Sequence, residues 1–179
     1  TASALRFEGV IPEETLPGKV LEPLGAALRV MVAADLLGAA DRMLEIAVDY
    51  AKLRQQFGRL IGSFQAVKHL CADMAAAIEP GRSLIWYAAY AQDAALGDAA
   101  LCALHAKAYM ADAARVTARN ATEVHGGIGI TEELRLHHWF KRISFDGQLF
   151  GGATRLRESA AVLQGLGPVG RNAMQMATE

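Results

Sequence analysis

The sequence predicts an all-α protein, an up-and-down bundle of the four-helix type with a short β and linker segment in front. Alanine is the commonest residue, with 35 occurrences among 179, and it favours closely packed helices. From Leu24 onward the apolar residues recur at spacings of three and four, the period of an amphipathic helix. Hydrophobic residues make up 53% of the chain, which is enough for a packed core.

Residues 1–22 differ from the rest and predict one strand and a linker. Apolar and polar residues roughly alternate from Thr1 to Val10, and prolines and a glycine follow. One strand cannot form a sheet, so we expect its partner strands in chain outside this sequence or in another subunit. The first residue is Thr rather than Met, which fits a piece of a longer protein.

Residues 23–166 are predicted to form the helical bundle domain, and residues 167–179 a disordered tail. Periodicity and break signals place the helices at about 24 to 55–58, 64–96, 99–125, from 131 onward, and 154–166. Gly58 is expected to take a left-handed conformation where the first helix ends, and Ser63 and Thr131 are expected as N-caps. Exposed apolar faces on the first and third helices would make the chain oligomeric.

Charge and cysteine content exclude several classes of protein. The formal net charge is −1, so the chain as a whole does not attract nucleic acid or an anionic membrane surface. The longest stretch without charged residues, 159–170, is shorter than the about 18 apolar residues that a membrane span needs. Cys71 and Cys102 lie far apart without metal-ligand spacing. We therefore expect reduced core cysteines and a cytoplasmic protein that binds neither nucleic acid nor membrane.

Two patterns resemble known sites but lack what those sites need. Gly127-Ile128-Gly129 would need a further glycine at position 132, which is Glu, and it follows a helix rather than a strand, so no dinucleotide fingerprint is predicted. His137 and His138 are adjacent and would point about 100° apart on a helix. They cannot chelate a metal as an i,i+4 pair would, so they are interpreted as surface or capping histidines and no metal site is predicted.

Arg54, with Phe57 and Gly58 just after it, allows two interpretations. A guanidinium at a helix C-terminus can simply interact favourably with the helix dipole. Alternatively, Arg54 binds a phosphate and Phe57 lies against a flat ring. Composition alone does not choose between these interpretations.

Longer segments around these residues resemble one family, the C-terminal helical domain of the acyl-CoA dehydrogenases. The resemblance covers about residues 5–165. Its motifs, in chain order, are Val10-Ile11-Pro12-Glu13-Glu14-Thr15-Leu16-Pro17-Gly18, Tyr50-Ala51-Lys52-Leu53-Arg54-Gln55-Gln56-Phe57-Gly58 with the segment to Leu70, and Glu123-Val124-His125-Gly126-Gly127-Ile128-Gly129 with Thr131-Glu132-Glu133. The first of these resembles the last strand of that family's middle β-domain.

The resemblance implies a share in a flavin site, because members of the family bind FAD between subunits. Arg54 and Phe57 would then meet the adenosine-diphosphate end of the flavin, and Gln65 would face it. Gly126 and Gly127 would let the backbone approach the pyrophosphate. The isolated domain would hold only half of such a site and would not retain the flavin.

At position 123 this chain has Glu where the family pattern usually has Gln. A carboxylate beside a pyrophosphate is repulsive unless it is paired, so the resemblance includes Glu123 in the cofactor edge but as an unfavourable neighbour.

The resemblance also implies a catalytic carboxylate, and this chain has none at the expected positions. The family reaction removes an α-proton from an acyl thioester while a β-hydride goes to the flavin, and the base is usually Glu before the last helix. Gly151 stands there. In some members the Glu lies on the first helix, where this chain has Leu28 followed by the matching Arg29, a substrate-binding candidate. We therefore expect no catalytic residue in this chain, at a typical cost of about 10²–10⁴-fold in rate.

Three functions remain open. The first is a base-lacking subunit of an acyl-CoA dehydrogenase flavoprotein, inactive alone, which meets acyl-CoA through the full-length protein in a homo- or hetero-oligomer with a catalytic subunit. The second is a non-enzymatic helical assembly module derived from that fold. The third is an active flavin enzyme with an unrecognised base, for which Asp146 is the candidate.

Overall fold

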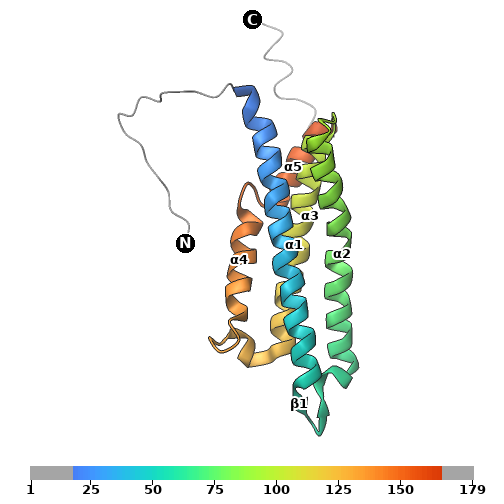
Figure 1. Cartoon of the computed structure of the whole chain (residues 1–179), viewed down its shortest axis with the longest axis vertical. Helices are drawn as coiled ribbons and strands as arrows, with labels where there is room; N and C mark the ends of the chain where they lie inside the picture. Colours follow the sequence, from blue (N-terminus) through green and yellow to red (C-terminus); the bar gives the residue numbers. More distant parts are fainter. Residues whose placement is uncertain (1–17, 167–179) are drawn as a thin grey trace, which may run out of the picture.

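The computed structural model describes residues 18–166, and they form a bundle of α-helices (Figure 1). Its elements are, in chain order, η1 (Gly18–Val20), α1 (Leu21–Leu53), β1 (Gln55–Gln56), β2 (Arg59–Leu60), η2 (Ile61–Ser63), α2 (Gln65–Asp93), α3 (Ala99–His125), η3 (Gly126–Ile130), α4 (Leu136–Gln148) and α5 (Ala153–Leu163). The all-α prediction is confirmed. The predicted N-terminal strand and C-terminal tail lie outside the described residues.

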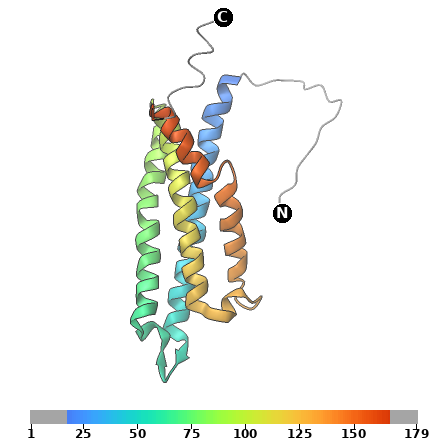
Figure 2. The same cartoon turned by 180° about the vertical axis from the view of Figure 1, so that it is seen from behind.

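The central element of the bundle is α3, which packs against α1, α2, α4 and α5. Two views from opposite sides show α2 along one flank of the bundle and α4 along the other (Figures 1 and 2). Because α3 is surrounded, its alanines are buried on several faces, among them Ala103, Ala106, Ala108, Ala111, Ala113, Ala114, Ala118 and Ala121. Small side chains at these positions let four neighbouring helices come close.

One glycine shows how closely the helices approach. Gly81 lies inside α2, directly after Pro80, and a Cβ built there would overlap Met110 Sδ of α3. Met110 itself is fully buried. The absence of a side chain at position 81 is therefore what lets α2 and α3 pack at this point.

Exposed apolar residues are distributed differently from the sequence expectation. The expectation is confirmed for α1, where Leu21, Leu24, Met31 and Leu53 are exposed. It is wrong for α3, where Val116 is the one large hydrophobic residue that is exposed, because the other helices cover the rest. The exposed aromatic residues Trp86, Tyr87 and Tyr90 lie on α2 instead.

The ends of three helices also differ from the predictions. Helix α1 ends at Leu53, and a hairpin replaces the expected loop. Ser63 is not the N-cap of α2, since its hydroxyl donates to the Leu60 carbonyl at 2.7 Å. Thr131 donates to the Ile128 carbonyl at 2.8 Å, and α4 begins five residues later, at Leu136, after Arg135 in a left-handed conformation. In both cases the hydroxyl stabilises the preceding turn, a common local alternative to a cap.

Helix α1 is long and apolar enough, by length and composition alone, to cross a bilayer. Its buried face packs against α2, α3 and α4, as expected of a core helix in a bundle. Cys71 and Cys102 are free thiols in half-buried positions. Burial raises the pKa of each thiol, which makes them less reactive.

Candidate functional site: a flavin edge and a vacant base position

The hairpin between α1 and α2 has an unusual two-residue turn. Gln55 pairs with Leu60 and Gln56 with Arg59, which leaves Phe57 and Gly58 at the tip. Both have positive φ, +53° and +74°, as a type I′ turn requires. An aromatic residue is rarely found at positive φ. Phe57 adopts this unfavourable conformation although the residue is 91% exposed. The turn therefore holds its ring out in solvent, where a ligand could contact it.

Cationic and aromatic side chains gather around this hairpin. Arg54 is exposed at the end of α1, and its N–H donates to the Tyr50 carbonyl at 2.9 Å. The Arg59 guanidinium lies 4.0 Å from the centre of the Phe64 ring, and Phe57 meets Phe64 edge-on at 6.2 Å. Two guanidinium groups beside an exposed ring suit an anion attached to a flat heterocycle.

Gln65 is the first residue of α2 and is also exposed. Its amide lies 3.1 Å from Nε2 of His69, one helical turn further along, and this contact orients the side chain at the start of the helix. The structure therefore places Gln65 directly after the hairpin, as the sequence predicts, although His69 already takes up one of its hydrogen-bonding groups.

The second motif lies at the end of α3. Gly126 has φ +64° and ψ −145°, a conformation essentially confined to glycine, and it is exposed, as is Gly127. A Cβ built on either residue would meet no atom within 4 Å, so the space beside this backbone is open. Glu123, one turn earlier, is exposed and forms no ion pair with any residue in the range 18–166. The predicted edge thus combines open backbone with one unpaired carboxylate.

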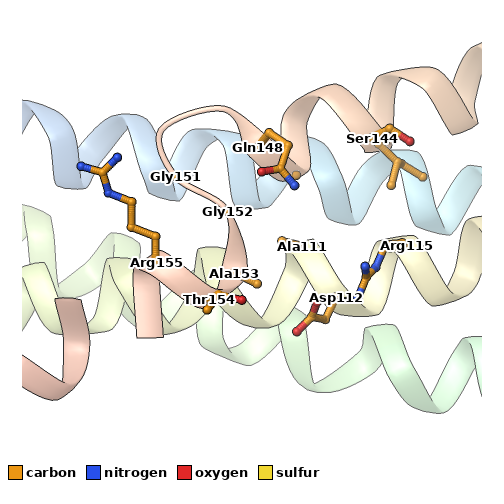
Figure 3. A pocket seen from close by; sticks show the side chains of 12 residues that line it. Ala111, Asp112, Arg115, Ser144, Gln148, Gly151, Gly152, Ala153, Thr154 and Arg155 are labelled. Atoms are coloured by element: carbon orange, nitrogen blue, oxygen red, sulfur yellow. Dashed lines mark hydrogen bonds and ion pairs between the residues drawn. The ribbon is translucent and has the colours of Figure 1, made fainter. Parts of the chain in front are cut away.

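Gly151, which stands at the base position expected from the family resemblance, lies between α4 and α5. Gly151 has φ +111°, and a Cβ built there would lie 3.0 Å from Leu156 Cδ2. It borders a pocket of about 550 Å³ between α3 and the loop that joins α4 to α5 (Figure 3). Asp112, the one carboxylate among the described residues that line this pocket, is paired with Arg115 at 3.2 Å and with Arg157 at 2.6 Å. No free base borders the described pocket.

The alternative base position and its neighbour lie on the first third of α1. Leu28 and Arg29 are half-buried, and Arg29 lines a second pocket, of about 520 Å³, between α1, α3 and α5. The Nε atom of Arg29 is buried and has no partner among the described residues. At 1.5 Å per residue, the helix separates Arg29 from Arg54 by roughly 37 Å. The structure therefore does not bring Arg29 together with the hairpin residues.

Asp146, the candidate for an unrecognised base, does not line the pocket beside Gly151. It is 7% exposed and faces the interior between α1, α3 and α4. There it lies near Asp35, 3.7 Å from Arg142 Nε, and close enough to Lys107 for the two charges to interact. Burial and, to a smaller extent, the neighbouring Asp35 carboxyl raise the pKa of Asp146 to about 6. The Asp146 carboxyl therefore belongs to an internal charge cluster rather than to the pocket beside Gly151.

This charge cluster connects the end of α4, just before the loop that contains Gly151, to the centre of the bundle. Lys107 is fully buried on α3 and donates to the Gly147 carbonyl, near the end of α4, at 3.2 Å. Burial lowers the pKa of Lys107 to about 8, and the charge of Asp146 opposes that effect. The hydrogen bonds from Arg142 hold the pKa of Asp35 below its usual value. Sequence reasoning missed Lys107, because one lysine among the alanines of an amphipathic helix carries no signal of burial.

The adjacent histidines are closer to each other than the predicted helix geometry allows. Their ring centres lie 4.0 Å apart because both turn toward Glu132, with Nε2 to carboxylate distances of 3.2 Å for His137 and 3.5 Å for His138. The His137 Nδ1 is buried without a partner among the described residues. A metal-binding histidine normally donates that second nitrogen to a carbonyl or carboxylate. Glu132 contacts both histidines of the first turn of α4, and the three ligand atoms lie within 4.8 Å of one another. Adjacency along the helix therefore does not keep the two rings apart as predicted.

Comparison with known proteins identifies the family. Residues 26–160 match the model of the acyl-CoA dehydrogenase C-terminal domain. The chain belongs to the acyl-CoA dehydrogenase family. Acyl-CoA dehydrogenase IpdE2 from Mycobacterium tuberculosis is 39% identical over 137 residues, which are 76% of this chain and 41% of IpdE2. This chain thus spans about two-fifths of the length of that relative.

Solved structures of this family superpose well on the bundle. A variant of the Tcur3481-Tcur3483 steroid ACAD matches with a TM-score of 0.79 and 31% identity, over 83% of this chain and 41% of that one. The ChsE4-ChsE5 complex from Mycobacterium tuberculosis matches with a TM-score of 0.78 and 29% identity, over 85% of this chain and 41% of that one. The fold expected from the family resemblance is confirmed.

Acyl-CoA dehydrogenases use FAD, and the residues at the hairpin and at η3 fit its adenosine-diphosphate end. Arg54 and Arg59 would supply positive charge for two phosphates and Phe57 an exposed ring. The open space beside the backbone at 126–127 would allow close approach. Glu123 is the exception, since its unpaired carboxylate would repel a phosphate.

Proposed function

We propose that this chain is the C-terminal domain of a base-lacking subunit in a heteromeric acyl-CoA dehydrogenase. The assembly would catalyse α,β-dehydrogenation of an acyl-CoA thioester, with a catalytic subunit supplying the carboxylate that removes the α-proton. The conformation of Gly151 is the observation that carries the proposal. At φ +111°, and with Leu156 against it, this position is built for a residue without a side chain.

The residues of this chain then have a binding role. FAD, when bound, is the acceptor of the substrate hydride. Arg54 would offset phosphate charge, Phe57 would lie against a ring of the cofactor, and Gly126 and Gly127 would offer backbone N–H groups to the pyrophosphate. Arg29, some distance from this edge, would contact the acyl-CoA substrate from the pocket between α1, α3 and α5.

The relationship of this chain to family members that form assemblies of two different chains supports pairing with a catalytic subunit. The ChsE4-ChsE5 complex and the Tcur3481-Tcur3483 steroid ACAD both contain two differently named chains, and both resemble this bundle closely. The exposed aromatic residues on α2 offer a surface of the kind that subunit interfaces bury.

The second candidate function is a helical assembly module that has lost the flavin. The unpaired carboxylate of Glu123 at the cofactor edge favours this alternative, because it weakens binding of any anion there. In that case the hairpin and the glycine turn would be remnants, and the exposed α2 surface would be the functional part.

Visible absorbance of the native-length protein across its size-exclusion peak separates these functions. We expect flavin absorbance only when the protein is co-expressed with a family member that has a carboxylate in the Gly151 position. We also expect acyl-CoA to bleach that absorbance in the mixed assembly. Flavin bound and bleached by the homo-oligomer would contradict the base-lacking subunit, and no flavin in either preparation would favour the assembly module.

A further inference from the structure

Two residues outside the predicted site connect its two halves. The ring of Tyr50, in the last turn of α1, stacks on the imidazole of His125, the last residue of α3. The ring centres lie 4.4 Å apart and the planes differ by 24°. Tyr50 lies one turn before Arg54, and His125 directly precedes Gly126. The stack is thus a side-chain contact between the helix end that bears the hairpin and the helix end that bears the glycine turn.

Each stacked residue is attached to its own segment through the backbone. The Tyr50 carbonyl accepts the Arg54 N–H at 2.9 Å, so a displacement of Tyr50 moves the residue that would grip a phosphate. His125 is followed by the glycine-only conformation of Gly126, and its Nδ1 donates to the Ala121 carbonyl at 2.7 Å. That hydrogen bond fixes both the tautomer and the plane of the imidazole.

The hydrogen-bonding state of His125 indicates that orientation, not only burial, is used. The residue is 5% exposed, and its Nε2 is buried with no partner among the described residues. A leucine would fill similar space without burying an unpartnered nitrogen. What histidine adds is a flat ring held in one plane by its own helix, which is the requirement for stacking on Tyr50.

The turns next to the stack leave little freedom for either segment to shift. A Cβ on Gly62, in η2, would lie 2.8 Å from the Ala51 carbonyl oxygen, so η2 packs directly on the last turn of α1. A Cβ on Gly129, in η3, would lie 3.0 Å from His125 Cβ and 3.1 Å from the Thr122 carbonyl oxygen. Both connecting segments therefore fold back tightly onto the helix turns that carry the stacked pair.

We propose that the Tyr50–His125 stack is a positioning pair that sets the spacing between Arg54 and the Gly126–Gly127 backbone. This rests on the proposed function, in which both segments contact the adenosine-diphosphate end of FAD. A ligand that bridges two segments binds more tightly when their spacing is fixed in advance, because less ordering remains to be done on binding. Neither Tyr50 nor His125 needs to touch the cofactor for this effect.

The test is FAD affinity of the native-length protein in its flavin-binding assembly, measured by titrating the apoprotein and following flavin fluorescence. Tyr50→Leu and His125→Leu should each weaken affinity about tenfold to a hundredfold. The double variant should lose no more than the worse single one, because both changes remove the same contact. Tyr50→Phe keeps both stacked rings and the His125 hydrogen bond to Ala121, so it should stay within about threefold of the wild type.

A matched control separates positioning from general loss of packing. Tyr109 is a tyrosine of α3 whose hydroxyl donates to the Ala77 carbonyl of α2 at 2.8 Å, away from the hairpin. Tyr109→Leu should lower the thermal stability of the apoprotein as much as Tyr50→Leu does, yet leave FAD affinity unchanged. Equal losses of affinity in these two variants would overturn the positioning role.

The same titration distinguishes failure of this inference from failure of the proposed function. If the wild-type assembly binds FAD and the leucine variants bind it equally well, the positioning role is wrong and the flavin function stands. If the wild type binds no FAD in any assembly, the flavin function is wrong and the positioning role falls with it.

Discussion

The two ends of this bundle differ in what they retain of an acyl-CoA dehydrogenase. Around the hairpin and η3, the charged, aromatic and glycine residues of a cofactor edge are in place and open to solvent. Toward the other end, Leu28 and Gly151 stand at the two positions where the resemblance leads one to expect a base. The loop at Gly151 adopts a conformation that suits glycine alone.

If the proposed function is correct, cofactor binding and proton abstraction are separable in this fold. The hairpin lies at one end of α1 and Leu28 near the other, roughly 38 Å away along the helix axis. Sites that share no contacts are usually independent in energy, so a substitution at one leaves the other intact. The proposed subunit would therefore lack a base and still contribute half of a cofactor site.

The largest effect on stability is expected from introducing a carboxylate at position 151, and the introduced group should not act as a base. Gly151→Glu places a side chain at positive φ and against Leu156, and we expect a loss of about 1–3 kcal/mol in the free energy of unfolding. Expressed without a catalytic partner, the variant should show neither flavin absorbance nor bleaching by acyl-CoA. Urea unfolding and visible absorbance measure the two effects.

Gly147→Ala is the matched control for that substitution. Gly147 lies inside α4 with ordinary helical φ and open space where a Cβ would be, so alanine should be neutral or slightly stabilising. A Gly151→Glu variant as stable as Gly147→Ala, with acyl-CoA bleaching its flavin, would mean that the loop accepts a base after all.

At the opposite end of the bundle, Arg54→Ala should weaken FAD affinity by about tenfold or more. The reason is that a hydrogen bond to a charged group typically contributes that much to binding. Stability of the apoprotein should hardly change, because Arg54 is exposed. Arg29→Ala and Arg42→Ala serve as controls, since the first lies far along α1 and the second is paired with Glu45 on the surface. Equal losses of flavin in all three variants would remove the distinction between the ends.

The interior charge cluster predicts a pH effect that is independent of flavin. The folded-state pKa of Asp146 is raised from 3.8 to about 6, so the folded state holds this proton more tightly than the unfolded chain. Its contribution to stability is therefore present below pH 4 and is lost as the pH rises to 6. Asp35 has a lowered pKa, so its contribution to stability is present above about pH 4 and is lost as the pH falls below that value.

Asp146→Asn tests this effect. The decline in stability between pH 4 and 6 should become shallower in urea unfolding curves, because the group that loses its proton is gone. Lys107 gives a second window: its pKa is lowered to about 8, so stability should rise between pH 8 and 10.5 as the buried ammonium loses its charge. An unchanged slope in Asp146→Asn would assign the titration to another group.

Glu123→Gln should give the smallest effect, and in the favourable direction. Removing an exposed carboxylate beside the proposed pyrophosphate site should strengthen FAD binding by up to about fivefold at low salt. The gain should shrink as salt is added, because exposed charges are screened. Weaker binding by the variant would show that Glu123 contributes a favourable contact of its own.

Much of the fold was predictable from the sequence because it depends on local signals. The apolar period, the alanine content and the glycine breaks gave the all-α class and the bounds of α3, which runs from Ala99 to His125 as predicted. Hydroxyl caps were less predictable. Ser63 and Thr131 have the right residue type but bond backward into the preceding turn, and only the three-dimensional path of the chain decides between those options.

The candidate site divides in the same way. The motif residues Arg54, Phe57, Gly126 and Gly127 were recognisable from short contiguous strings, and so was the glycine at the base position. The sequence by itself determined which chemical groups are available and that a carboxylate is missing at residue 151. These properties belong to residue identity and near neighbours.

The tertiary structure alone decided how those groups relate to one another. It stacked Tyr50 on His125 and turned Asp146 of α4 inward toward Lys107 of α3. It also separated Arg29 from the hairpin by most of the length of α1. Each relation joins residues on different helices or far apart on one helix. Such contacts depend on how helices pack against one another, and the helical period of a single segment contains no information about that packing.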